Sequence, residues 1–376
     1  MQKDLGLYIH IPFCLQKCKY CDFLSACGND AQKEVYTSAL INEIKEAGKS
    51  AKNHIVSTVY IGGGTPTCLD EEKLVEIIKT IKQNFSFTEA FEFTVEANPE
   101  TVSLRLMRAL YEQGVNRISL GVQSMNDTTL KKIGRVHDVI KVLESYAACR
   151  LAGFENVNYD LIFALPDQSE KDFIEDLQNL LKLEPKHISV YSLQLEEGTP
   201  LFDEKDNYTF ADEDTERRMY YKAREILKEH GLIQYETSNF AVPGFESKHN
   251  ERYWECKEYL GLGLGASSYF NNVRYQNPSN MENYIGFTKN FIPLYKESPP
   301  LTTEEMQSEF VVLGLRKTKG ISCSEFYEKF GADIHSIFED VINKHIKNGL
   351  LIEKEGRIYL SEHGMDVSNT VLCDFI

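Results

Sequence analysis

The chain has 376 residues, of which 42% are hydrophobic and 11% aromatic, and this excludes a disordered tether because the apolar content suffices for a substantial core. Its formal net charge of −16 argues against nucleic acid as a partner, since an acidic surface repels phosphate groups. No stretch approaches the roughly 18 apolar residues that cross a bilayer, so we expect no integral membrane segment.

The chain starts with charges at Lys3 and Asp4 and without a sustained apolar run, which is not the pattern of a secretion signal. It contains nine cysteines, an odd number. Without a secretion signal, these features favour a cytoplasmic protein with reduced thiols over a secreted protein with a disulfide framework.

Short β-rich runs then alternate with helical segments. The expected strands are residues 5–11, 57–66, 91–99, 117–124, 157–166 and 188–195. The expected helices are residues 33–47, 74–85, 104–113, 139–152, 173–183 and 215–229. This alternation predicts an α/β fold with a parallel sheet, either a β/α barrel or a doubly wound sheet.

Polar side chains near the ends of these strands favour the barrel. Glu96, Gln123, Asp160 and Gln194 each lie late in an apolar run. The carboxyl ends of parallel barrel strands carry the active site. Because a carboxylate inside a strand is costly without a partner, Asp160 is either a ligand-facing group or a hydrogen-bonded structural residue. We predict a partial parallel β/α barrel of the TIM type.

The pattern changes after Pro299 and Pro300, which break the chain. Helical stretches are expected at residues 306–316, 324–330 and 334–348, followed by a hairpin whose turn contains Gly356. This order predicts a winged-helix-like α+β domain that covers the barrel. The expected domains are a barrel at residues 1–240, a connecting segment at 241–300 and the C-terminal domain at 301–376.

Three cysteines lie within eight residues in "HIPFCLQKCKYCDF", as Cys14, Cys18 and Cys21 in the spacing C-x3-C-x2-C. Thiolates hold iron–sulfur clusters, and a 4Fe–4S cluster ordinarily takes four of them. Three cysteines leave one iron open, which would admit a cofactor or substrate. A zinc site completed by His10 or Cys27 is the alternative.

The segment "YIHIPFCLQKCKYCDF" resembles the radical S-adenosylmethionine (SAM) superfamily, and within it the branch of coproporphyrinogen oxidase and HemW. The resemblance extends through most of the chain. It implies a radical SAM barrel with a 4Fe–4S cluster on Cys14, Cys18 and Cys21. In this superfamily SAM chelates the open iron.

Further positions match residues of the same branch that surround SAM. The matching residues are Tyr8, Tyr20, Gly62, Gly63, Gly64, Thr65, Glu96, Gln123, Arg135 and Asp160. By resemblance, the "GGGTP" segment holds the SAM amino group and Glu96 contacts SAM, whereas Gln123, Arg135 and Asp160 match the surroundings of a second SAM in the oxidase. From the residues alone, the tyrosines fit ordinary packing, the glycines fit a turn, and the last three fit a polar network inside the barrel.

Two functions of different classes follow from the resemblance. The oxidase would decarboxylate porphyrinogen propionates to vinyl groups, whereas HemW is a chaperone that binds heme and delivers it to an acceptor protein. The oxidase motif continues to a further cysteine where this chain has Phe23, and the oxidase has an N-terminal extension before its first strand. Both departures favour the heme chaperone. A radical SAM enzyme for another substrate is a third possibility.

The segment "HNERYW", residues 249–254, also matches HemW. His249 offers an imidazole to heme iron, with Tyr253 and Trp254 as flat neighbours. The alternative is a loop histidine that is hydrogen-bonded to the backbone. The expected partners are therefore heme or a porphyrinogen, a heme-acceptor protein and an electron donor.

Overall fold

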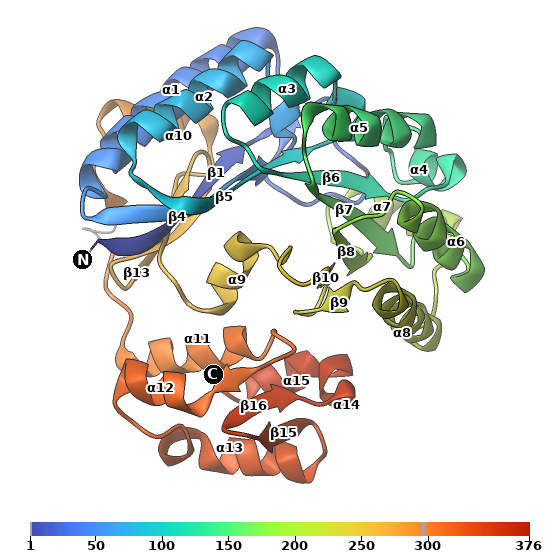
Figure 1. Cartoon of the computed structure of the whole chain (residues 1–376), viewed down its shortest axis with the longest axis vertical. Coiled ribbons are helices and arrows are strands. Elements are labelled where there is room, and N and C mark those ends of the chain that lie inside the picture. Colours follow the sequence, from blue (N-terminus) through green and yellow to red (C-terminus); the bar gives the residue numbers. More distant parts are fainter. Residues whose placement is uncertain (1, 295–297) are drawn as a thin grey trace.

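The computed structural model describes residues 2–294 and 298–376, which form a large α/β part and a smaller C-terminal part (Figure 1). The large part is built on an 11-stranded sheet with the order β13-β12-β11-β1-β4-β5-β6-β7-β8-β10-β9. Its strands in chain order are β1 (Lys3–Ile11), β4 (His54–Gly63), β5 (Phe87–Ala97), β6 (Arg117–Gln123), β7 (Asn156–Phe163), β8 (His187–Ser192), β9 (Ile233–Gln234), β10 (Asn239–Ala241), β11 (Tyr259–Leu262), β12 (Ser267–Phe270) and β13 (Val273–Gln276).

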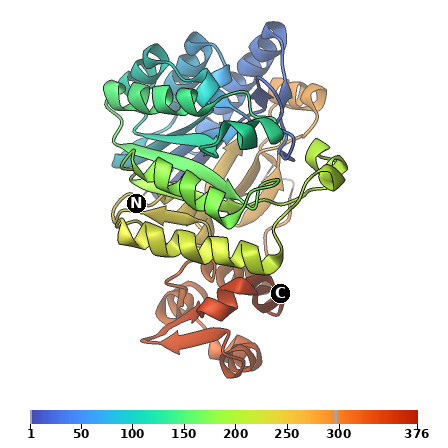
Figure 2. The same cartoon turned by 90° about the vertical axis from the view of Figure 1, so that its right-hand side faces the viewer.

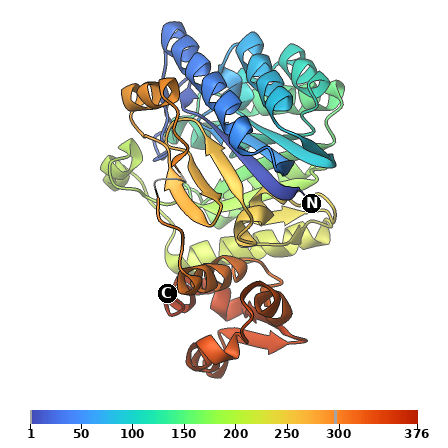
Figure 3. The same ribbon diagram turned by 90° about the vertical axis from the view of Figure 1, so that its left-hand side faces the viewer.

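The strands β1, β4, β5, β6, β7 and β8 pair in parallel, and β11 joins β1 in parallel on the other side. The remaining strands pair antiparallel at both edges. In the described residues, the sheet runs from β13 to β9 without closing, and it is strongly curved (Figures 1 and 3). The predicted partial parallel β/α barrel is therefore confirmed.

Helices line the convex face of this sheet, as Figure 1 shows for α1, α2, α3, α5 and α6. The helices of the large part are α1 (Asp30–Ser50), α2 (Glu71–Asn84), α3 (Leu104–Glu112), α4 (Asp127–Lys132), α5 (Val139–Ala152), α6 (Glu170–Leu181), α7 (Pro200–Asp203), α8 (Glu213–Glu229), α9 (Lys248–Trp254) and α10 (Met281–Lys289). Short 3-10 turns occur at η1 (Pro66–Cys68), η2 (Pro99–Thr101) and η3 (Lys205–Asn207). In contrast to the outer helices, α9 lies on the inner side of the sheet.

The core between the sheet and the outer helices is continuous and apolar. Alternate residues of β1, such as Leu5, Leu7 and Ile9, are fully buried, and they pack with Leu40 and Ile44 of α1 in one cluster. Burial of one such side chain contributes about 1.5–3 kcal/mol, so this cluster fixes the register of the sheet. Among the described residues, every helix is too short or too polar to cross a bilayer.

The small C-terminal part has a core of its own, centred on Phe326, Ile342 and Ile358. Its elements are α11 (Thr303–Gly314), β14 (Ile321–Ser322), α12 (Cys323–Phe330), α13 (His335–Lys347), β15 (Leu351–Lys354), β16 (Arg357–Leu360), α14 (Glu362–Asp366) and α15 (Ser368–Cys373). The expected three helices and the hairpin are present, and β14 adds a third strand next to β16. This arrangement is the predicted winged-helix-like pattern.

The small part lies below α8 and α9 (Figures 1 and 2). The Tyr221 hydroxyl of α8 donates to Asp366 of α14 at 2.9 Å, and Arg274 of β13 pairs with Glu309 of α11 at 2.5 Å. The expected boundaries at residues 240 and 300 remain predictions. Within 241–300, the chain adds β11, β12 and β13 to the large sheet.

One buried acid connects the outer helix α1 to this added segment. Glu43 is 1% exposed, and its carboxylate accepts hydrogen bonds from the Gly263 amide at 2.8 Å, the Asn277 amide group at 2.6 Å and the Tyr284 hydroxyl at 2.6 Å. Burial raises the pKa of Glu43 to about 7. The carboxyl group therefore satisfies three donors that have no access to water.

Replacing Glu43 by alanine is expected to lower the free energy of unfolding by about 2–4 kcal/mol, because it leaves buried donors without an acceptor. Glu46→Ala is the matched control on the same helix, since Glu46 is 41% exposed and pairs only with Lys49 among the described residues. The control should lose less than about 0.5 kcal/mol. Chemical denaturation followed by circular dichroism measures both changes, and equal losses would contradict the assigned role of Glu43.

Candidate functional site

A cavity of about 440 Å³ lies at the carboxyl ends of the central parallel strands. The loop after β1 supplies Cys14, Cys18 and Cys21 to its wall. The strands supply a polar wall opposite this loop. The strand residues in that wall are Tyr60, Gly63, Glu96, Ala97, Arg117, Ser119, Gly121, Gln123, Asn158, Asp160, Ile162, Ser189, Tyr191 and Ser192.

The cysteine loop is held to the barrel by backbone hydrogen bonds. The Lys19 amide donates to the Ile133 carbonyl at 3.0 Å, and the Leu201 amide donates to the Lys19 carbonyl at 2.9 Å. The short strands β2 (Phe13–Cys14) and β3 (Ala26–Cys27) pair in parallel at the two ends of the loop. The loop therefore has a fixed position relative to the strand ends.

The three cysteines form no disulfide bonds, and their thiols are partly exposed to the cavity. Thr65 Oγ1 donates to Cys14 Sγ at 3.6 Å, and Arg135 Nη1 donates to Cys18 Sγ at 3.4 Å. Burial raises the pKa of Cys21, and the charges of Cys18 and Cys14 add to the rise. Once deprotonated, the three thiolates repel one another, and the Arg135 guanidinium offsets part of this charge. Such a site suits an inorganic centre that takes several thiolates.

The residues proposed to complete a zinc site lie elsewhere. His10 Nε2 is 2.8 Å from the Leu24 carbonyl and Nδ1 is 3.0 Å from the Tyr8 hydroxyl, so both ring nitrogens are engaged. Cys27 is exposed and donates to the Leu15 carbonyl. Among the described residues that line the cavity, neither His10 nor Cys27 occurs. The donor set thus fits a centre held by three thiolates better than a four-ligand zinc site.

Glycines allow the carboxylate of Glu96 to lie against the end of β4. The Gly63 amide donates to Glu96 Oε2 at 3.0 Å, and the Tyr60 hydroxyl donates to Oε1 at 2.7 Å. A Cβ on Gly62 would lie 2.7 Å from the Glu96 carboxyl carbon, and Gly63 has a φ of +110°. Burial raises the pKa of Glu96 to about 7, although the hydrogen bond from Tyr60 lowers the pKa in part.

The polar wall contains a buried hydrogen-bond network. The Asn158 amide donates to Asp160 Oδ1 at 2.7 Å and to Ser119 Oγ at 2.8 Å, and Asn158 Oδ1 lies 2.6 Å from His187 Nδ1. Burial raises the pKa of Asp160, although the hydrogen bond from Asn158 opposes the rise. The network orients Asp160 toward the cavity.

Two arginines bring positive charge to this network. Arg135 Nη2 donates to the Gly121 carbonyl at 2.5 Å while Nη1 contacts Cys18. The Nε atoms of Arg117 and Arg135 are buried and have no hydrogen-bond partner among the described residues. Unsatisfied buried donors beside a cavity indicate a place for an anionic or polar ligand group. Gln123 adds a left-handed backbone, with a φ of 69°, at the end of β6.

The structure brings together most of the residues predicted to surround a cofactor. Those that line the cavity are Cys14, Cys18, Cys21, Tyr20, Gly63, Gly64, Thr65, Glu96, Gln123, Arg135 and Asp160. Gly62 lies directly behind the Glu96 carboxylate. Tyr8 is set back from the wall, where its ring stacks on that of Tyr60 with centroids 6.3 Å apart.

Sequence reasoning missed Arg117, Asn158, Ser189 and Tyr191, which also line the cavity. They alternate with buried apolar residues and occupy the same face of their strands as Gln123 and Asp160. The period-two pattern of β6, β7 and β8 was the signal that could have identified them.

His249 is not in this cavity. It is 1% exposed, its Nδ1 is 2.9 Å from Thr58 Oγ1 and its Nε2 is 2.8 Å from the Tyr253 hydroxyl. Burial lowers its pKa to about 3, so the ring is neutral. A ligand can reach a ring nitrogen only after one of these hydrogen bonds breaks.

The helix α9, which carries His249, separates the first cavity from a second. Asn250 lines the cysteine cavity, whereas Tyr253 and Trp254 line a cavity of about 830 Å³ between the large and small parts. The other residues in the wall of the second cavity are Cys256, Lys257, Tyr259, Tyr269, Arg274, Leu301, Glu304, Glu305, Ser308, Glu309, Val312, Leu313 and Ile376. This wall is mainly apolar and aromatic. It also carries two cations, Arg274 and Lys257, and three acids, Glu304, Glu305 and Glu309.

Comparisons with known proteins agree with this architecture. The family described as the Radical SAM superfamily matches residues 8–180, and the HemN C-terminal domain matches residues 301–367. The solved structure of coproporphyrinogen III oxidase (HemN) from Escherichia coli superposes with a TM-score of 0.86, covering 100% of this chain and 90% of that one. At 22% identity, this likeness shows the fold alone.

The curated relatives are more similar in sequence. The heme chaperone HemW of Bacillus subtilis is 37% identical, covering 98% of this chain and 98% of its own length. The heme chaperone HemW of Lactococcus lactis is 36% identical, covering 100% of this chain and 98% of its own length. The chain therefore belongs to the HemW family of radical SAM proteins.

Proposed function

We propose that this chain binds heme and delivers it to an acceptor protein, as the name heme chaperone states for its relatives. Membership of the radical SAM superfamily implies a 4Fe–4S cluster and SAM. We further infer a cytoplasmic location, because reduced thiols persist in that compartment. The observation that carries the proposal is the position of α9 between the cysteine cavity and the large aromatic cavity.

In this proposal, Cys14, Cys18 and Cys21 hold the cluster. The guanidinium of Arg135 lies against Cys18 and compensates part of the negative charge of the thiolates. When bound, the cluster and SAM supply one-electron chemistry. The surrounding protein orients these groups and keeps water away from them.

The remaining cavity residues are proposed to bind SAM. Gly63, Gly64 and Thr65 line the cavity and are proposed to contact SAM with their backbone groups, while Gly62 lacks a side chain where the Glu96 carboxylate packs behind them. Glu96, Gln123 and Asp160 offer polar groups opposite the thiols, and the free Nε donor of Arg135 suits a carboxylate. Tyr20 lines the cavity and is hydrogen-bonded to Arg135. Tyr8 stacks on the side of Tyr60 that faces away from the cavity.

The second cavity has the chemistry that heme requires. A porphyrin is a flat apolar ring with two carboxylates, so it binds between aromatic walls with cations near its edge. Tyr253, Trp254 and Tyr269 supply aromatic walls. The two cations are paired, Arg274 with Glu309 and Lys257 with Glu255, so a heme carboxylate would exchange with these acids. We therefore place heme between the large and small parts of the chain.

His249 is the proposed iron ligand, and Tyr253 controls access to it. Tyr253 lines the second cavity and holds His249 Nε2 with its hydroxyl, so rotation of the Tyr253 ring would open a path from the cavity to Nε2. The neutral state of His249 suits metal ligation, because a protonated imidazole cannot bind iron. Asn250, next in the chain, faces the cysteine cavity, so α9 contacts both sites.

Phe23 supports the chaperone over the oxidase. The oxidase motif has a further cysteine at this position, whereas Phe23 is 63% exposed at the wall of the cysteine cavity. A test of either function therefore includes an assay for conversion of coproporphyrinogen. Conversion without heme binding would overturn the proposal.

Replacing Cys14 by alanine is expected to abolish the cluster, because two remaining thiolates do not hold a 4Fe–4S centre. Cys27→Ala is the matched control, since Cys27 is exposed and outside the cavity wall. Anaerobic reconstitution followed by iron analysis and absorbance measures the result. A Cys14→Ala protein with the iron content of the control would refute the assigned ligand.

Replacing Trp254 by alanine is expected to weaken heme binding by about tenfold or more, because loss of an aromatic wall removes about 1.4 kcal/mol or more of contact energy. Tyr327→Ala is the control, since Tyr327 is 60% exposed on α12 and does not line the second cavity. A heme titration followed by absorbance measures both affinities. Equal affinities for the two variants would exclude this cavity as the heme site.

Replacing His249 by alanine is expected to change the heme absorption spectrum, because the proposed axial ligand is lost, and to leave the cluster intact, because the cysteine loop is unchanged. His230→Ala serves as the control, since His230 is exposed and bonds the Ile226 carbonyl at the end of α8. Spectra of the heme-loaded proteins test the assignment. Identical spectra for His249→Ala and the unmodified chain would show that another group ligates the iron.

A further inference from the structure

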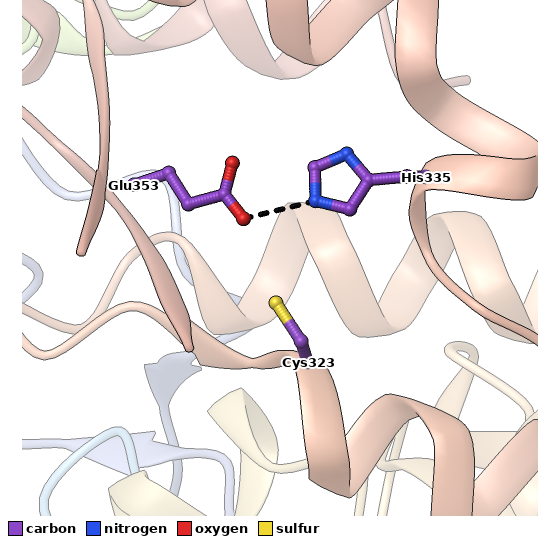
Figure 4. A group of neighbouring side chains, drawn as sticks. All are labelled: Cys323, His335 and Glu353. Atoms are coloured by element: carbon purple, nitrogen blue, oxygen red, sulfur yellow. Dashed lines mark hydrogen bonds and ion pairs between the residues drawn. The ribbon is translucent and has the colours of Figure 1, made fainter. Parts of the chain in front are cut away.

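Three side chains of the metal-ligating type meet in the small C-terminal part, far from the cysteine loop in sequence. Cys323 is the first residue of α12, His335 is the first residue of α13, and Glu353 lies on β15. Figure 4 shows the imidazole and the carboxylate facing each other while the Cys323 thiol points toward the gap between them. The thiol sulfur, a ring nitrogen and a carboxylate oxygen all lie within 4.8 Å of one another.

The backbone holds these three positions firmly. The Cys323 amide donates to the Gly356 carbonyl at 3.0 Å, which ties the start of α12 to the turn of the hairpin. The His335 amide donates to Asp333 Oδ1 at 2.9 Å, which fixes the start of α13. Glu353 lies opposite Ile358 in the β15–β16 ladder. The cluster therefore depends on the fold of this part and not on mobile surface loops.

The donor set selects for a particular class of metal. A thiolate and an imidazole favour zinc and similar transition metals, whereas magnesium and calcium prefer oxygen ligands alone. In a tetrahedral zinc site, neighbouring donors lie roughly 3.3–3.7 Å apart, since Zn–S is about 2.3 Å and Zn–N about 2.0 Å. His335 Nε2 and Glu353 Oε1 are 2.9 Å apart as a hydrogen-bonded pair, so they would have to separate by about 0.4 Å and lose the shared proton to hold one ion. The Cys323 thiol, which lies within 4.8 Å of both atoms, would have to move toward them to complete the geometry.

Charge and access also suit a cation. The carboxylates of Glu353 and Asp333 bring negative charge close to the Cys323 thiol. The side chains of His335 and Glu353 are 34% and 36% exposed, which leaves a path from solvent.

We propose that Cys323, His335 and Glu353 bind one zinc ion. Three protein ligands leave the fourth position open, as in zinc sites that accept water or a group from another molecule. Such an ion would join the starts of α12 and α13 to the hairpin and would offer a coordination position on the surface of the small part. This site is separate from the proposed cluster and heme sites.

The test uses the full chain with its cluster reconstituted anaerobically, so that Cys14, Cys18 and Cys21 are occupied. Equilibrium dialysis against Zn²⁺ and metal analysis should give one zinc per chain above the reconstituted iron. Cys323→Ser and His335→Gln should each weaken zinc binding by at least about tenfold. The matched control is Cys373→Ser, which alters the exposed cysteine of the same part and should retain the zinc.

Cobalt provides a second measurement. Co²⁺ in the same site should give a thiolate-to-cobalt absorption band that is absent in Cys323→Ser and present in Cys373→Ser. The proposal is overturned if the unmodified chain binds no zinc, or if Cys323→Ser and His335→Gln retain it with the affinity of the control. In that case, His335 and Glu353 form an ordinary ion pair beside a half-buried cysteine.

Discussion

The position of three thiols at the carboxyl end of a parallel sheet is the constraint on which the rest of the site depends. Because neighbouring strands run in the same direction, the residues that end β4, β5, β6, β7 and β8 all face the cysteine loop. Glu96, Asp160 and Arg135 are consequently buried around one space, and each needs a partner there. The protein satisfies part of this need with Tyr60, Asn158 and backbone groups, whereas the Nε atoms of Arg117 and Arg135 have no hydrogen-bond partner among the described residues.

The helix α9 lies between the cysteine cavity and the second, aromatic cavity. Its first turn is held by Glu92, which accepts from the amides of Lys248 and His249 at 3.0 Å each. Arg252 anchors its last turn through Asp4 at 2.6 Å and Ser57 at 2.6 Å. The helix is thus fixed to β1, β4 and β5, the strands next to the cysteine loop. A ligand in the aromatic cavity would therefore contact a helix whose position is set by the barrel.

The sequence predicted those features that depend on local patterns. The α/β alternation, the C-terminal hairpin around Gly356, the cysteine motif and the polar strand ends at Glu96 and Asp160 all follow from spacing or period. Features that depend on distant contacts were not predictable in the same way. The pairing of β11 with β1 joins residues about 250 positions apart, and the burial of His249 depends on Thr58, 191 positions away. Tyr8 does not line the cavity, because Tyr60, its partner on the neighbouring strand β4, lies between Tyr8 and the cavity.

The proposed cluster has three protein ligands, Cys14, Cys18 and Cys21, and one open iron. Electron paramagnetic resonance of the reduced, oxygen-free protein tests it most directly, with spectra recorded before and after addition of SAM. An open iron predicts that SAM changes the spectrum of the cluster, because the added molecule becomes a ligand. An unchanged spectrum, together with metal analysis that shows a centre fully ligated by protein, would contradict the account.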